Sequence, residues 1–383
     1  MPRPLRIGIN ALRLTPRRVD SAEVYVRNLL SALAVIDHHN IYMVFINRET
    51  EQDICPVAKN FHVVQSSITG KISPLCLLRE QVFLPLQGMR RHLDIFFSVG
   101  FTAPIASPAR KVTMIDDLQH KFLPTYFSPF KLQIRKLAAW STIKASHCLL
   151  TTTEQLKMDL KQAYRVPSKR IKVIPHGIER FFFNLKENAG YGEGSLTKEQ
   201  IPECPYFLAV PTLYLGKNWE RLLEAYNRLL QKGLTEHLVV TGVQGRKERR
   251  RIEHAIKKMG LESQVHILGL LPRPIMTTLF KYAEALILPS MPESSSMPLM
   301  EAMAAGLPVA CSDTPALRET AAGAAIFFNP FSVDEISVAI SQILGDTALR
   351  SQLTDRGKNR AAGAAWRTTA EKTLAALLET GRS

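Results

Sequence analysis

The sequence predicts an α/β protein made of two doubly wound, parallel-sheet domains of the Rossmann-like type. Short apolar runs that suit buried parallel strands alternate with amphipathic segments that suit helices, and this alternation occurs as two separate series. The length of 383 residues also fits two domains better than a single core. Two such domains facing across a cleft bind ligands beyond the carboxyl ends of their strands.

The first series predicts an N-terminal domain over residues 1–180. Its expected strands are residues 5–10, 41–47, 61–65, 93–98, 111–115, 148–151 and 171–174. Its expected helices are residues 25–36 and 130–146, and the second of these carries four basic side chains. The following segment, residues 181–205, is rich in Asn, Gly, Glu and Lys, a composition typical of a linker.

The second series predicts a C-terminal domain over residues 206–363. Its expected strands are residues 206–210, 237–241, 264–268, 285–288, 309–311 and 325–328. Its expected helices include residues 219–230, 246–258 and 275–282. The last segment, residues 364–383, is expected to be a helix that packs back toward the N-terminal domain.

Composition narrows the kind of partner and the compartment. Apolar residues make up 46% of the chain, but no run approaches the ~18 residues of a membrane helix. The net charge of +15 is concentrated in residues 1–200, which hold 28 Lys and Arg against 16 Asp and Glu. This excess favours an anionic membrane surface or a phosphorylated lipid, and simple solubility is the alternative. Nucleic acid is not expected, because no stacking aromatics are interleaved with the basic residues.

Five scattered cysteines without a CxxC pair indicate a reducing compartment. The N-terminus begins like a strand and has no signal-peptide core. We therefore expect a cytoplasmic protein that docks peripherally on the inner face of the membrane.

The most informative segment is residues 289–313, where Glu293 and Glu301 stand with seven residues between them. An apolar strand precedes this segment, and Ser296 is suited to cap a following helix that Gly306 ends. Such a junction directs backbone N–H groups and the positive end of a helix dipole toward an anion. The two carboxylates on either side could accept hydrogen bonds from ligand hydroxyls, as a nucleotide-diphosphate sugar requires. The alternative is a capped surface helix with two solvated glutamates.

This segment closely resembles the E-x7-E signature of the retaining glycosyltransferases of family 4, which have the GT-B fold. The chain keeps both glutamates and the family's Pro298, Gly306 and Pro308, and it has three serines where the family has Gly-Phe-Gly. Residues 173–178 and 217–223 resemble two further family elements, and residues 94–104 resemble bacterial polysaccharide mannosyl- and rhamnosyltransferases. The resemblance therefore covers nearly the whole chain.

The resemblance implies a set of active-site residues. Those implied for catalysis are Glu293, Lys217 and Asp116. Those implied for donor binding are Glu301, Ser296, Met297, Pro298, Leu299, Leu270 and Leu271. Lys217 and the N–H groups of residues 296–299 are expected to hold the diphosphate, Glu301 the ribose hydroxyls and Glu293 the sugar hydroxyls. The backbone near residues 270–271 is expected to meet the base, and no metal or other cofactor is required.

Three departures from the family pattern fall on the expected catalytic cleft. Gly216 replaces an arginine that would face the diphosphate, and Asp20-Ser21-Ala22-Glu23 replaces a Gly-Gly loop. Asp116 replaces the histidine that the family holds close to the reacting sugar. A carboxylate there is unfavourable beside a departing diphosphate unless it meets a cation or an acceptor hydroxyl.

The resemblance implies a hexosyltransferase that moves a sugar from a nucleotide-diphosphate sugar to a glycan or lipid-linked oligosaccharide in surface polysaccharide synthesis. In this mechanism the leaving phosphate helps to deprotonate the acceptor, and the protein orients both substrates and stabilises charge. Two alternatives stay open. One is a non-catalytic donor-binding subunit that partners another transferase, which the three departures motivate. The other is a sugar-nucleotide epimerase, for which no motif is apparent.

Overall fold

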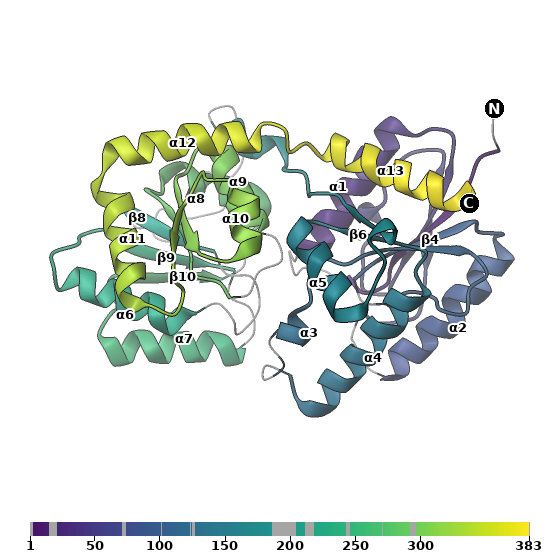
Figure 1. The fold of residues 1–383 in the computed structure, drawn as a ribbon, viewed down its shortest axis with the longest axis horizontal. Coiled ribbons are helices and arrows are strands. Elements are labelled where there is room, and N and C mark those ends of the chain that lie inside the picture. The colour runs from purple at the N-terminus through teal and green to yellow at the C-terminus, as the bar shows by residue number, and fades with distance from the viewer. Residues whose placement is uncertain are drawn as a thin grey trace. The chain divides into compact units, whose positions relative to one another are not determined.

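The structure of the protein is a computed structural model. The described residues are 3–14, 21–70, 74–100, 102–122, 124, 127–185, 204–210, 218–242, 246–269, 271–291 and 296–382. They form two compact units (Figure 1): unit 1 comprises Met1–Gly177 and Ala365–Ser383, and unit 2 comprises Ile178–Ala364. Within this part of the chain, no helix is long and apolar enough to cross a membrane.

Unit 1 is built on a seven-stranded parallel sheet in the order β3-β2-β1-β4-β5-β6-β7. The strands are β1 (Arg6–Ala11), β2 (Ile41–Ile46), β3 (Phe61–Gln65), β4 (Ile95–Val99), β5 (Arg110–Met114), β6 (Cys148–Thr151) and β7 (Ile171–Val173). The helices are α1 (Ser21–Ile36), α2 (Pro74–Arg90), α3 (Gln119–Phe122), α4 (Pro129–Ala145), α5 (Glu154–Tyr164) and α13 (Trp366–Arg382). The last helix, α13, packs on α1 (Figure 1), so the C-terminal segment is part of this unit.

Unit 2 is built on a six-stranded parallel sheet in the order β10-β9-β8-β11-β12-β13. The strands are β8 (Tyr206–Ala209), β9 (His237–Thr241), β10 (Val265–Gly269), β11 (Leu286–Leu288), β12 (Val309–Ser312) and β13 (Ile326–Phe328). The helices are α6 (Trp219–Leu230), α7 (Arg246–Met259), α8 (Arg273–Tyr282), α9 (Met297–Ala305), α10 (Pro315–Ala321), α11 (Val333–Gly345) and α12 (Thr347–Ala361). Two doubly wound parallel sheets confirm the predicted fold class.

The core of unit 2 shows why its strands read as continuous apolar runs. Phe207 and Ala209 of β8 belong to one buried cluster, whereas Tyr206 and Leu208 belong to another. Successive side chains of a strand point to opposite faces, so both faces of this sheet are covered. Of the expected linker, residues 181–185 and 204–205 are described, and Phe182 is fully buried in the second of these clusters.

Helix α1 corrects one expectation. We expected a loop over residues 20–23 and a helix from residue 25, but α1 already begins at Ser21 and includes Glu23 in its first turn. The segment has no glycine to favour a loop, and an acidic side chain in the first turn is favoured by the helix dipole. Asp20 lies outside the described residues.

Candidate functional site

The site residues in unit 2 are positioned by the strand–loop–helix junction predicted from the sequence. Strand β11 ends at Leu288, and α9 begins at Met297 with Ser296 as its N-cap. The Ser296 Oγ accepts a hydrogen bond from the backbone N–H of Leu299 at 3.4 Å. At the other end Gly306 adopts φ 77°, a conformation that glycine takes without strain, and its N–H caps the helix. The predicted N-cap and C-terminal stop are both confirmed.

The cap narrows the set of N–H groups that α9 can offer to an anion. Pro298 has no N–H, and the N–H of Leu299 is used by Ser296. Of residues 297–299, only Met297 therefore keeps an N–H that neither the cap nor proline removes. Leu299 is fully buried, whereas Met297 and Pro298 are half-buried. Leu299 thus anchors α9 in the core, and Met297 and Pro298 are the more accessible residues of its first turn.

Glu301 lies one turn into α9 and is almost fully buried, with only 2% of its surface exposed. Its Oε1 accepts a hydrogen bond from Nη2 of Arg273 at 2.6 Å. The same guanidinium donates to both carboxylate oxygens of Glu179, through Nη2 at 2.5 Å and Nε at 3.1 Å. Arg273 also lies over the ring of Phe182, 5.0 Å from its centroid. Arg273, Glu179 and Glu301 form a buried ionic cluster, which we call the α9 triad.

The pKa values in this triad are determined by burial and by the sharing of one cation between two carboxylates. Burial raises the pKa of Glu301, the charge of Glu179 raises it further, and Arg273 opposes both effects. Burial alone would lower the pKa of Arg273, but the two carboxylates outweigh it and the pKa is raised. The guanidinium therefore stays charged and orients Glu301. Any further hydrogen-bond donor that reaches Glu301 would stabilise its charged carboxylate.

Leu271 lies in the connection between β10 and α8, two residues before Arg273. It is half-buried and packs against the apolar cluster that contains Leu299. This connection brings the expected base-binding segment and Arg273 to the same part of unit 2 as α9, because α8 contacts α9. Three expected site residues lie outside the described residues, namely Glu293, Lys217 and Leu270.

Asp116 lies in unit 1, two residues after β5 ends, and is half-buried. Its charge acts on the Tyr25 hydroxyl, whose pKa is raised mainly by burial and also by Asp116. The Tyr25 ring lies 4.9 Å from the ring of His176. Asp116 therefore belongs to a cluster at the carboxyl-terminal edge of the unit 1 sheet, to which β5, β7, α1 and α13 each contribute.

His176 is an unusual member of that cluster. Burial lowers its pKa to about 4, so its imidazole is neutral at physiological pH. Neither ring nitrogen has a hydrogen-bond partner among the described residues. The ring stacks on Trp366 with a centroid distance of 6.1 Å and an interplanar angle of 22°.

Sequence reasoning did not single out Arg273, Glu179 or Tyr25. Arg273 has one local signal, because it stands between Pro272 and Pro274, and proline is favoured at the start of a helix. Within the part of the chain that is described, no group of three or more His, Cys, Asp or Glu side chains could hold a metal ion.

The chain is similar to known glycosyltransferases. Residues 197–360 match the family model described as "Glycosyl transferases group 1". The chain is 24% identical over 266 residues to O-antigen chain mannosyltransferase B of Escherichia coli, which covers 69% of each chain. Among solved structures, sucrose-phosphate synthase from Thermosynechococcus elongatus has a TM-score of 0.81, 17% identity and 98% coverage of both chains. Anabaena HepE in complex with UDP-glucose has a TM-score of 0.72 and 15% identity, with 98% of this chain and 100% of that chain covered.

The two parallel-sheet units have the GT-B fold of these solved structures. The match over residues 197–360 and the mannosyltransferase relative support a GT4-like glycosyltransferase and, in class, a hexosyltransferase. The predicted family resemblance and enzyme class are therefore confirmed.

Proposed function

We propose that this chain transfers a hexose, with retention of configuration, from a nucleotide-diphosphate sugar to a glycan or lipid-linked oligosaccharide in surface polysaccharide synthesis. The observation that carries the proposal is Glu301, a buried carboxylate that Arg273 holds one turn inside α9. A carboxylate fixed at this depth suits a ligand that presents hydroxyl donors beside an anionic group. The O-antigen relative supports the polysaccharide setting, and the HepE complex supports a nucleotide-sugar donor.

In this proposal unit 2 binds the donor. Glu301 accepts the ribose hydroxyls, and the N–H of Met297 and the dipole of α9 stabilise the diphosphate together with Lys217. Glu293 accepts hydroxyls of the transferred sugar, and the backbone at Leu271 meets the base. As the glycosidic bond breaks, negative charge grows on the diphosphate, so these positive groups stabilise the transition state more than the ground state. The leaving phosphate takes the acceptor proton, and neither a metal nor a protein base is required.

Unit 1 binds the acceptor in this proposal. Asp116 is the carboxylate there that can accept a hydrogen bond from an acceptor hydroxyl. Tyr25 contributes a buried hydroxyl that stays protonated, because burial and Asp116 both raise its pKa. His176 is held neutral beside them and can accept or donate a hydrogen bond without adding charge.

The acceptor setting is a membrane surface, for which α2 and α4 supply a suitable face. Both helices connect strands in the same direction across the sheet, so right-handed crossovers place them on one face, and Figure 1 shows them together there. Ala103 joins them, since its carbonyl accepts from Gln81 of α2 and its N–H donates to Thr142 of α4. Exposed apolar side chains on the two helices are Leu75, Leu78, Val82, Leu86, Met89, Phe130, Leu137 and Trp140.

Exposed cations accompany these apolar side chains, with Arg79 and Arg90 on α2 and Lys131 and Lys136 on α4. A helix face that combines apolar and basic side chains binds the interface of an anionic bilayer. We expect the chain to bind vesicles of phosphatidylcholine and phosphatidylglycerol at low salt and to leave them at high salt. Leu78→Glu should weaken this binding, whereas Val338→Glu, a matched change on α11 of unit 2, should not. Failure to bind these vesicles at low salt would contradict peripheral docking.

Turnover of purified full-length protein with a panel of UDP-, GDP- and dTDP-sugars tests the function. We expect one donor to be hydrolysed or transferred. Glu301→Gln should lower that rate about ten- to a hundredfold, the value of one hydrogen bond to a charged group. Glu293→Gln should also lower it, whereas Glu262→Gln, the same change at an exposed glutamate of unit 2, should leave it unchanged. Binding of a donor without turnover, even with lipid-linked acceptors present, would instead support the non-catalytic subunit.

A further inference from the structure

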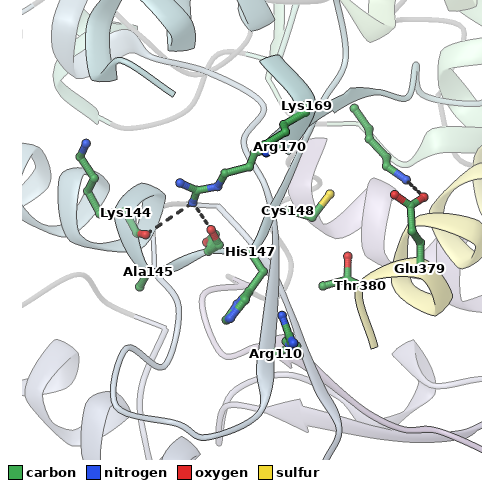
Figure 2. Close-up of a pocket in the computed structure, with 11 residues that line it drawn as sticks. Arg110, Lys144, Ala145, His147, Cys148, Lys169, Arg170, Glu379 and Thr380 are labelled. Atoms are coloured by element: carbon green, nitrogen blue, oxygen red, sulfur yellow. Dashed lines mark hydrogen bonds and ion pairs between the residues drawn. The ribbon is translucent and has the colours of Figure 1, made fainter. Parts of the chain in front are cut away.

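Unit 1 contains a basic pocket that the proposed transfer reaction does not use. Its volume is about 400 Å³, which lies in the range of small-molecule sites. Its described lining consists of Arg110, Lys144, Ala145, Ser146, His147, Cys148, Lys169, Arg170, Lys172, Glu379 and Thr380. In the view of Figure 2, Lys169 and Arg170 lie in the upper part and Arg110 and His147 in the lower part.

The pocket lies at the amino-terminal ends of its strands. Arg110 and Cys148 are the first residues of β5 and β6, Lys172 is the second residue of β7, and α13 lines the pocket with Glu379 and Thr380. Ligands of doubly wound sheets bind at the opposite, carboxyl-terminal ends, where Asp116 lies. The pocket is therefore separate from the Asp116 cluster, and it contains none of the donor-binding residues of unit 2.

Positive charge dominates the lining. Five residues carry permanent cations, and the only carboxylate among the described lining residues is Glu379, which forms an ion pair with Lys172 (Figure 2). Among the described residues, no carboxylate lies within salt-bridge distance of Arg110, Lys144 or Lys169. Concentrated like charges repel one another, so an anion that enters the pocket is stabilised by several cations at once.

Two of the basic side chains are held in place by hydrogen bonds. Arg170 Nη2 donates to the carbonyls of Ser146 and, at 3.1 Å, Ile143, and thereby satisfies the C-terminal end of α4. His147 Nδ1 accepts a hydrogen bond from the backbone N–H of Lys111 at 3.1 Å, which leaves Nε2 to carry the proton of the neutral ring. Burial, Lys111, Arg110 and Arg170 lower the pKa of His147, as expected where the local potential is positive.

The lining also limits what kind of anion fits. Apart from the His147 ring it offers no aromatic side chain among the described residues, so it cannot stack a nucleotide base. Ala145 and Cys148 are its only apolar described members, so an acyl chain gains little there. Arginine and lysine together are the residues with which proteins bind phosphate.

We propose that this pocket binds a phosphate-bearing ligand through Arg110, Lys144 and Lys169, with the ligand displacing Glu379 from Lys172. The phosphate belongs either to a small soluble molecule or to a lipid headgroup, and the two sources share the same recognition chemistry. Glu379 is the competing anion within the chain. Removal of the Glu379 carboxylate should therefore strengthen phosphate binding, because Lys172 is then free to pair with the ligand.

Histidine-detected NMR of the full chain, with His147 assigned by His147→Asn, tests this proposal. Inorganic diphosphate is added at constant ionic strength, and we expect a saturable shift of the His147 signal and a rise in its pKa. Lys144→Gln and Lys169→Gln should each weaken diphosphate binding roughly fivefold, the effect of one unit charge about 4 Å away in water. Glu379→Gln should strengthen it by a similar factor. Lys161→Gln, the same charge change at an exposed lysine of α5, should have no effect.

Vesicles of phosphatidylcholine and phosphatidylglycerol form the second arm. A His147 response to diphosphate alone assigns a soluble phosphate ligand, and a response to vesicles that Lys144→Gln and Lys169→Gln weaken identifies a headgroup; either supports the pocket. The Lys217→Gln variant should respond to diphosphate as the wild type does, which separates this site from the diphosphate position of the proposed donor site. The proposal is overturned if His147 responds to neither probe, or if all three lysine substitutions, Lys161→Gln included, weaken binding equally.

Discussion

Replacing Arg273 by methionine tests how the α9 triad holds Glu301. The substitution keeps an apolar stem over Phe182 but removes the single cation that two carboxylates share. The side chains are 21% exposed for Arg273, 11% for Glu179 and 3% for Glu301. Removing one partner of a buried ion pair costs about 3–5 kcal/mol, because the remaining charge stays buried without compensation. We expect a loss of this size in the free energy of unfolding of unit 2.

The loss should depend on pH, and its sign follows from Glu301. The pKa of Glu301 is already raised by burial, and without Arg273 it rises further. A carboxyl group whose pKa is raised by folding stabilises the folded state at low pH, and this contribution is lost as pH rises through the folded-state pKa. Arg273→Met should therefore be most destabilising at neutral pH and less so in acid. Glu179→Gln in the same background should recover part of the loss.

Native-state hydrogen exchange of the β12 amides measures this free energy within unit 2 alone. Arg228→Met is the matched control, because Arg228 pairs with Glu224 and Asp334 on the surface, where the side chains are 42%, 48% and 86% exposed. The control should cost at most about 1 kcal/mol. A loss for Arg273→Met no larger than the control, or one that is independent of pH, would refute the triad as the support of Glu301.

Three further predictions concern local features. Ser296→Ala removes the α9 cap and should cost about 1 kcal/mol, seen as faster hydrogen exchange in the first turn of α9, whereas Ser296→Asp should retain protection. Burial holds the pKa of His176 near 4, so the wild type should lose up to about 3 kcal/mol of its free energy of unfolding as pH falls from 6.5 to 4. His176→Asn should flatten this pH dependence in unit 1, which hydrogen exchange of the β1 amides measures. Gly177→Ala would place a Cβ against the backbone N of Trp366, so α13 must shift at a cost of about 1–3 kcal/mol. Limited proteolysis should then cleave α13 more readily.

Local sequence patterns predicted most of the fold, because buried apolar residues recur along the sequence with the period of the helix or strand that carries them. The apolar runs at β3, β6 and β9 coincide with the predicted strands residue for residue, and α6 coincides with its predicted helix. Helix α2 was not predicted. Its residues Leu78, Val82 and Leu86 face solvent, so the apolar pattern marks its exposed side rather than its core side, and Pro85 lies within it.

Only the local structure around the expected site was predictable. The cap signal predicted that α9 begins after Ser296, which puts Glu301 about one turn into the helix. The α9 triad joins residues that are 94 and 28 positions apart, and no periodicity or spacing connects them before the chain folds. The basic pocket likewise joins strand starts to the C-terminal helix, so its charges look dispersed in the sequence.

The most direct test of the account is whether Glu301 binds donor ribose. The affinity of the full chain is measured for UDP and GDP and for their 2′,3′-dideoxy counterparts, with wild type and Glu301→Gln. We predict that wild type prefers the ribose form of one nucleotide, and that Glu301→Gln weakens that form about tenfold or more while leaving the dideoxy form unchanged. Equal losses for both forms, or no preference for ribose in the wild type, would contradict the donor site on α9.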